Sequence, residues 1–428
     1  MTEPNEGMVN SEVVGLYSLA YASVRSDSSP TGDECPTKRL QPLLELSAQA
    51  LHAAVILGLA GCGTAPPVQP PPVVVAAPAK TPRYYGTDNL QKELGALFTQ
   101  PYSDTQSVEV IYATNRNPLG DPADCNDASF GISPGEKLSY GLCALNVPKR
   151  HKIGGFEVAP NPRADPHQYY RVLNHSPLDE AALDERLRAK QGSDLLVFIH
   201  GFNVKFQEAV LRSAQIAYDL KFQGPVVLFS WPAGAEEGMF NSAMVNRTYA
   251  DNLSNAIKTV PLAQAFFKQL AGLNQTVHVM VHSMGHQVTL RALSQLSSVQ
   301  DKPFIGELLL NAPDVPVKDF QRMAPQIKKL AGRMTVYCSY NDNAIAASET
   351  YNKNRRMGGC ERTPGVDMIN VGEIDAPALG IGGLGPGYYA SRPIITDIFQ
   401  VLLGIPAEQR LFIRKSEPNS TEDYYLRP

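Results

Sequence analysis

The chain has 428 residues, of which 43% are hydrophobic and 19% charged, and its formal net charge is −4. This length accommodates one large domain with appendages, or two small domains. Because the net charge is small and negative, the chain has no global attraction to nucleic acid or to an anionic membrane surface, and no nucleic-acid partner is expected.

The first segment in chain order, residues 1–37, is acidic and featureless and is expected to be an unstructured leader. Residues 38–62 begin with Lys38 and Arg39 and continue through a short apolar run to Cys62. A basic start followed by a short apolar run is typical of a secretory signal peptide, whose basic start lies close to its own N-terminus. This order indicates that the translation start has been placed too early. A cytoplasmic tail with the apolar run as a weak anchor is the alternative.

The end of this apolar run, Leu-Ala-Gly-Cys at residues 59–62, resembles the lipobox of bacterial lipoproteins. In those proteins the signal is cut before the cysteine, which then carries a lipid. Seven prolines in the 19 residues 65–83 predict an extended spacer within a linker over residues 63–106. The resemblance implies lipidation at Cys62, membrane attachment through that lipid and a place in the bacterial cell envelope. An ordinary hydrophobic helix that ends at Gly-Cys is the alternative.

The remaining cysteines follow from this assignment. With Cys62 lipidated and Cys35 removed, four are left in a compartment that permits disulfides: Cys125, Cys143, Cys338 and Cys360. Four cysteines allow three connectivities. Sequence proximity favours the pairs 125–143 and 338–360, and four free thiols are the alternative.

The main domain is expected over residues 107–405, where strand-like and helix-like runs alternate. This alternation predicts an α/β fold with a mostly parallel, doubly wound sheet. Only about 22 residues separate Asn311 from Arg333, which leaves no room for a large cap domain. Residues 406–428 are expected to be a polar C-terminal tail. The expected strands cover residues 108–115, 137–147, 194–200, 225–231, 276–281, 306–314, 333–342 and 366–375.

A candidate nucleophile follows one of these strands. Ser283 stands after a buried strand and before a helix, which is the setting of a nucleophile elbow with the pattern G-x-S-x-G. Gly285 occupies the last position of that pattern. Val281 stands where the first glycine belongs, and we expect its side chain to distort the turn.

The other parts of an acyl-transfer site can also be placed. The His200-Gly201 pair ends an earlier strand, where the backbone N–H of Phe202 can face the serine as an oxyanion donor. Met284 supplies the second N–H. A plain strand-end turn is the alternative.

Two aspartates end late strands and are candidates for the acid that orients a catalytic base. Asp342 is the first choice and Asp314 the reserve, although an aspartate at a strand end is often only a helix cap. Metal-ligand spacing, a dinucleotide-type glycine motif and a P-loop are all absent from the sequence, so no metal and no cofactor is expected.

Several motifs occur in a fixed order along the main domain. They are VIYATNR, LSYGLC, VFIHGFN, GPVVLFSWP, HSMG, LLLNAPDV and YCSYNDNA. Together they resemble a bacterial α/β-hydrolase family of unknown function with esterase-like members, over about residues 108–403. The resemblance implies an α/β-hydrolase fold and a triad in the order Ser283, Asp342 and a later histidine. It also implies a small acyl-ester or lipid-like ligand.

The triad histidine is the point at which the chain departs from that family. No histidine follows His286, and Pro386 or Gly387 stands where the family reads L-G-H-S-Y. His175, in a segment expected to fold over the mouth of the site, is the candidate substitute base. The sequence therefore predicts either an esterase-like or lipase-like hydrolase that attacks through Ser283 with an unorthodox base, or a catalytically silent hydrolase fold that binds a ligand or an envelope partner.

Overall fold

The structure is a computed structural model that describes residues 105–428, except 121–124, 149, 156, 160, 162–163, 166–167, 189–192, 237–241, 301, 375–388 and 390. The predicted leader, the signal peptide with Cys62 and nearly all of the linker lie outside the described residues. Within the described residues, no helix has both the length and the apolar character needed to cross a bilayer.

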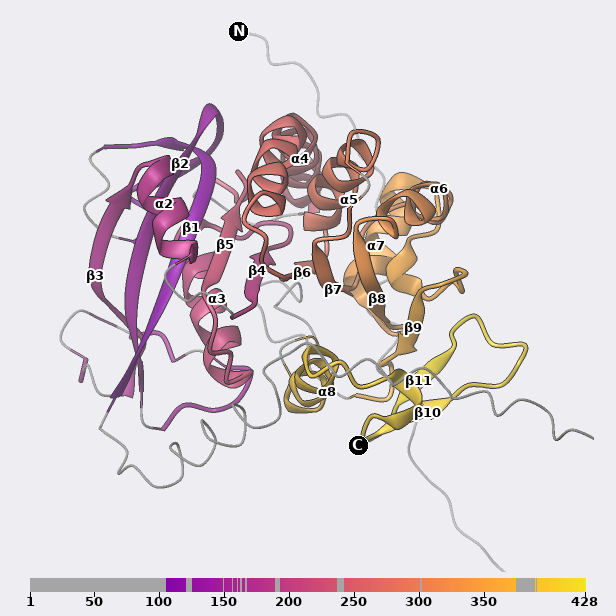
Figure 1. Cartoon of the computed structure of the whole chain (residues 1–428). Coiled ribbons are helices and arrows are strands. Elements are labelled where there is room, and N and C mark those ends of the chain that lie inside the picture. Colours follow the sequence, from indigo (N-terminus) through magenta and orange to yellow (C-terminus); the bar gives the residue numbers. More distant parts are fainter. Residues whose placement is uncertain are drawn as a thin grey trace, which may run out of the picture. The chain divides into compact units, whose positions relative to one another are not determined.

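One large sheet organises the described part of the chain (Figure 1). Its strand order is β10-β11-β9-β8-β7-β6-β4-β5-β1-β2-β3. The eight strands from β11 to β1 run parallel, and antiparallel partners flank them at both edges. The strands are β1 (Thr105–Pro118), β2 (Phe130–Pro148), β3 (Arg171–Leu178), β4 (Leu195–Ile199), β5 (Val226–Ser230), β6 (Val277–His282), β7 (Ile305–Asn311), β8 (Ala331–Cys338), β9 (Asp367–Asn370), β10 (Ile413–Lys415) and β11 (Tyr424–Leu426).

Helices connect the strands and cover both faces of this sheet. They are α2 (Glu180–Arg188), α3 (Phe206–Asp219), α4 (Ser242–Ala271), α5 (Gly285–Leu296), α6 (Val317–Ile327), α7 (Asn343–Asn352) and α8 (Arg392–Leu402), with short 3-10 turns η2 (Met357–Gly359) and η5 (Ala407–Gln409). Between β7 and β8 the chain forms only α6, so no large cap domain is inserted there. The predicted α/β-hydrolase fold is confirmed.

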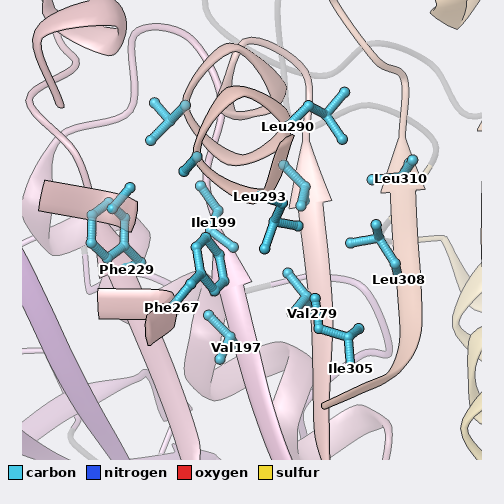
Figure 2. Packing of buried hydrophobic residues seen from close by; sticks show 14 of the residues in the cluster. Val197, Ile199, Phe229, Phe267, Val279, Leu290, Leu293, Ile305, Leu308 and Leu310 are labelled. Carbon is cyan, nitrogen blue, oxygen red and sulfur yellow. The ribbon is translucent and has the colours of Figure 1, made fainter. Parts of the chain in front are cut away.

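The central strands are apolar along their whole length because helices bury both of their faces. β4 reads LLVFI and β5 reads VVLFS, and every residue of both is buried. Successive side chains alternate between the faces. Val197 and Ile199 pack on one face of the sheet with α4 and α5 (Figure 2). Leu196 and Phe198 pack on the other face with α3 and α8.

Both disulfides favoured by sequence proximity form in the structure. One joins Cys125 to Cys143, and the other joins Cys338 to Cys360. All four sulfur-bearing side chains are fully buried. The second bridge ties the turn after η2 to the end of β8, next to the loops that surround the serine turn.

The predicted end of the domain at residue 405 is wrong, because residues 406–428 continue the fold. Strand β11 pairs in parallel with β9, and β10 forms the edge of the sheet. Arg410 lies in this segment and makes a fully buried ion pair with Asp397 of α8, at 2.8 Å. Tyr337 also donates to that carboxylate, at 2.6 Å. The polar segment 406–428 therefore contributes Arg410 to a buried ion pair and does not form a separate tail.

Candidate active site

Ser283 occupies a sharp turn between β6 and α5. Its φ angle is +49°, a left-handed conformation that is uncommon for residues other than glycine and that marks strained functional turns. The Ser283 N–H donates to the carbonyl of Asn311 at 3.0 Å, which fixes the turn to the end of β7. Val281 is buried in the core and keeps its register with both neighbouring strands. The expected distortion by Val281 is therefore wrong, because the elbow forms with the valine in place.

Two glycines allow the elbow to approach the end of β4. A Cβ atom added at Gly285 would lie 2.4 Å from the carbonyl oxygen of His200. A Cβ atom added at Gly201 would lie 2.9 Å from the Cβ of Ser283. The added atom would clash with backbone at Gly285, and at Gly201 it would also lie 2.7 Å from Nδ1 of the His282 ring. The structure therefore brings the His200-Gly201-Phe202 loop directly against the serine, as the sequence predicts.

In the part of the chain that the structure describes, the candidate oxyanion donors have no competing partner. Among the described residues, the backbone N–H groups of Phe202 and Met284 donate to no acceptor, and the Ser283 hydroxyl has no hydrogen-bond partner. Backbone N–H groups next to a nucleophile can stabilise the charge of a tetrahedral intermediate. This arrangement can therefore receive the carbonyl oxygen of an acyl group.

Asp342 lies after β8, which is two strand steps from the serine strand β6, with β7 between them. Its Oδ1 accepts from the N–H groups of Ala344 and Ile345 at 2.9 and 3.0 Å, and so caps α7. Burial raises the pKa of this carboxyl group above its ordinary value. No histidine in the described part of the chain contacts it. Its Oδ2 takes no hydrogen bond there either, which leaves one oxygen for an imidazole.

Asp314 lies closer to the serine but is fully engaged. Its N–H donates to the Ser283 carbonyl at 3.4 Å, while its buried carboxylate accepts from Tyr249 at 2.8 Å and Ser348 at 2.5 Å. Arg356 forms an ion pair with the same carboxylate at 3.2 Å. These partners assign Asp314 a structural role that braces the elbow, rather than the reserve acid role.

The predicted substitute base, His175, is wrong. It lies on β3, the edge strand that is five strand steps from β6, so at about 4.8 Å per step the separation is roughly 24 Å. Its Nε2 is instead 3.0 Å from the hydroxyl of Tyr112. The segment that was expected to cover the site pairs with β2 and extends the sheet.

The two histidines that flank the serine are also held away from a base role. His286 Nδ1 lies 2.6 Å from the backbone carbonyl of Ser283, and burial lowers its pKa to about 3. His282 stacks on Tyr389, with ring centroids 4.0 Å apart. Burial, followed by the charges of His286 and Arg212, lowers the pKa of His282 to about 3.

Among the residues that the structure describes, no histidine makes a hydrogen bond to the Ser283 hydroxyl. His167, Pro386 and Gly387 lie outside the described residues. Two features of the site were not predicted: the Tyr389 ring that covers His282, and the contact between Asp314 and the elbow. The sequence held no signal for either, because both arise from long-range packing. No group of three or more His, Cys, Asp or Glu side chains in the described regions could hold a metal ion.

The model of the alpha/beta hydrolases of unknown function (DUF900) matches residues 177–405, more than half of the chain. The chain belongs to this family. No curated protein matches it.

The chain is also similar to solved esterase structures. A cold-adapted esterase from an Arctic intertidal metagenomic library, bound to PEG, is 13% identical with a TM-score of 0.32, and the match covers 70% of this chain and 96% of that chain. A fungal esterase from Rhizomucor miehei is 12% identical with a TM-score of 0.29, covering 74% of this chain and 88% of that chain.

Proposed function

We propose that this α/β hydrolase is a serine esterase that attacks through Ser283 without a histidine base. The observation that carries the proposal is the strained Ser283 turn held against Phe202 and Met284, two backbone donors that are free among the described residues. Strain of this kind persists only where the surrounding structure imposes it. A turn that served only packing would not need a left-handed serine with an unengaged hydroxyl.

The reaction is an acyl transfer. The Ser283 oxygen attacks the ester carbonyl carbon, and its proton passes to water or to a base in solution. The tetrahedral intermediate places its negative oxygen between the Phe202 and Met284 N–H groups and expels the leaving group as an alkoxide, which takes a proton from water. Water then hydrolyses the acyl-enzyme, which releases the carboxylic acid and restores the Ser283 hydroxyl. Because oxyanion donors and substrate binding alone leave about 10³–10⁴-fold catalysis over water, turnover should be slow. The ligand class is a small acyl ester or a lipid-like ester.

Restoration of the missing base tests this proposal. We expect Pro386→His, or Gly387→His in the neighbouring register, to raise hydrolysis of a short p-nitrophenyl ester, because a positioned base contributes about 10²–10⁴-fold. The gain should vanish when Ser283→Ala is added, and Val281→Ala serves as a control that changes the packing beside the elbow without adding a base. No gain in either histidine variant, with folding confirmed by circular dichroism, would contradict the proposal.

A second candidate function is binding without turnover, in which the fold holds a ligand or an envelope partner. The observation that favours it is that no described histidine makes a hydrogen bond to the Ser283 hydroxyl. In that case a boronic acid should bind the protein reversibly while ester hydrolysis stays at the rate of buffer alone, before and after Pro386→His.

We also propose that the protein is a lipoprotein of the bacterial cell envelope, tethered through a lipid on Cys62. The lipobox-like residues 59–62 and the proline-rich spacer support this proposal. Two buried disulfides are compatible with an oxidising compartment outside the cytoplasm.

A further inference from the structure

Arg116, at the end of β1, is a buried arginine directly behind the loop that carries Phe202. It is 1% exposed, and all five of its side-chain N–H groups are engaged. Nε donates to the Ser230 hydroxyl at 2.9 Å. The remaining four donate to uncharged acceptors as well: Gly131 O (3.2 Å), Ala233 O (2.7 Å), Val204 O (2.7 Å) and His200 Nε2 (3.3 Å).

This set of partners is unusual because it contains no carboxylate. A buried guanidinium normally pairs with an acid, since an unpaired buried charge costs several kcal/mol. Burial lowers the pKa of Arg116 to about 9, with Asp127 opposing the shift, so the side chain stays charged at neutral pH. Arg116 is therefore a buried cation, and none of its five side-chain N–H groups donates to a carboxylate.

The arginine fixes the tautomer of His200. Arg116 can only donate, so His200 Nε2 must accept and the ring proton must be on Nδ1. Nδ1 lies 3.0 Å from the carbonyl oxygen of Gly201 and therefore donates to it. The ring is held in this position by stacking on Trp231, at 5.3 Å between centroids, and the Trp231 Nε1 donates to the His200 carbonyl at 2.8 Å. Burial and the charge of Arg116 lower the pKa of His200, which keeps the ring neutral.

The orientation of one peptide group follows. No cis peptide occurs in the described residues, so the Gly201 carbonyl and the Phe202 N–H point in opposite directions. Because the carbonyl points to His200, the N–H points away from it. Gly201 lies against Ser283, where an added Cβ would be 2.9 Å from the serine Cβ. Arg116 holds the next turn of the same loop as well, through the Val204 carbonyl.

We infer that Arg116 is a positioning residue for the oxyanion donor. It acts through His200, whose Nδ1–H tautomer it stabilises. That tautomer orients the Gly201–Phe202 peptide so that the Phe202 N–H faces the acyl oxygen bound at Ser283. This inference rests on the proposed esterase function for its kinetic consequence. Its structural part, the tautomer, is independent of any reactivity of the serine.

A matched pair of variants separates positioning from packing. Asparagine places an amide N–H near the position of Nδ1, whereas leucine has a similar size and no donor. We expect His200→Asn to react with a fluorophosphonate probe within about tenfold of the wild-type rate. His200→Leu should react about 10²–10³-fold more slowly, which is the loss typical of one oxyanion donor. For a p-nitrophenyl ester the loss should fall on kcat with KM unchanged. Equal rates for both variants, at matched melting temperature, would overturn the inference.

Histidine-ring ¹⁵N NMR provides the second measurement. The wild-type spectrum should show His200 with its proton on Nδ1. The Ser230 hydroxyl also lies 3.3 Å from His200 Nε2, so it can donate there as well. Arg116→Lys, which keeps a charged donor to Nε2, should preserve the tautomer, and Arg116→Met combined with Ser230→Ala, which removes both donors, should lose it and slow labelling. An Nε2–H tautomer in the wild type would overturn the inference even if Ser283 reacts. If His200 has the Nδ1–H tautomer but the probe never labels the protein, the esterase function is contradicted. His200 would then have no working oxyanion donor to position, so the positioning role of Arg116 would be contradicted as well.

Discussion

His286 makes the serine turn sensitive to acid, and replacing it tests how the elbow is held. Its Nδ1–H donates to the Ser283 carbonyl at 2.6 Å. Its Nε2 is buried and has no hydrogen-bond partner among the described residues. A protonated ring would carry a second N–H at that nitrogen with no described acceptor, so the folded state favours the neutral ring. This is the physical reason for the depressed pKa.

The size of the effect follows from linkage. The pKa of His286 falls from the ordinary 6.5 to about 3 in the folded state. A histidine whose folded pKa is depressed contributes stability above its unfolded pKa and loses it as pH falls below 6.5 toward the folded pKa. At pH 5 the unfolded ring is 1.5 pH units below its pKa. At about 1.4 kcal/mol per unit, the free energy of unfolding drops by roughly 2 kcal/mol relative to pH 7.

The matched variant is His286→Asn, because the asparagine amide can replace the Nδ1–H donor and does not titrate. Urea unfolding at pH 7 and pH 5 should show a loss of stability that is about 2 kcal/mol larger in the wild type than in His286→Asn. The other buried histidines titrate in both proteins and cancel in this difference, apart from the part of the His282 shift that comes from His286, which ranks behind burial. The same loss in both proteins would show that His286 is not held neutral beneath the elbow, and would refute the reasoning.

Three further outcomes are expected. Removing the Cys125–Cys143 bridge, which closes a loop with a sequence separation of 18, should lower the free energy of unfolding by about 3 kcal/mol in the chain-entropy model, and an unchanged melting temperature would contradict this. Asp342→Asn should be labelled by a fluorophosphonate at the wild-type rate, because no described histidine needs orienting. The same substitution should abolish any gain from Pro386→His. Slower labelling of Asp342→Asn alone would show that Asp342 already orients a base. Cys62→Ser should release the protein from the membrane fraction or block signal processing, and unchanged fractionation would count against the lipid anchor.

The amino-acid sequence was sufficient to predict the central part of the fold because buried parallel strands consist of continuous runs of apolar residues. The runs that form β4, β5 and β6 end at the residues of the site, so the sequence alone predicts that Gly201, Ser283 and Met284 lie together. The cysteine pairs followed from proximity along the chain.

The parts that could not be predicted are those whose partners are distant in the sequence. Strand β3 is largely solvent-exposed and has no apolar run, so it resembled a covering loop, and His175 was misplaced with it. The segment that contains Arg410 has the composition of a solvated tail, and only the fold brings Asp397 to it as a counter-charge. Nothing in the sequence around Arg116 indicates that it is buried, because its partners come from distant segments of the chain.

The central claim is that Ser283 is a nucleophile in a working oxyanion site that has lost its base. Incubation of the purified protein with a fluorophosphonate probe, followed by peptide mass spectrometry, tests it most directly. We expect slow labelling at Ser283 alone, faster labelling when imidazole is added, and none in Ser283→Ala. Complete absence of label on Ser283 after prolonged incubation with imidazole would contradict the claim.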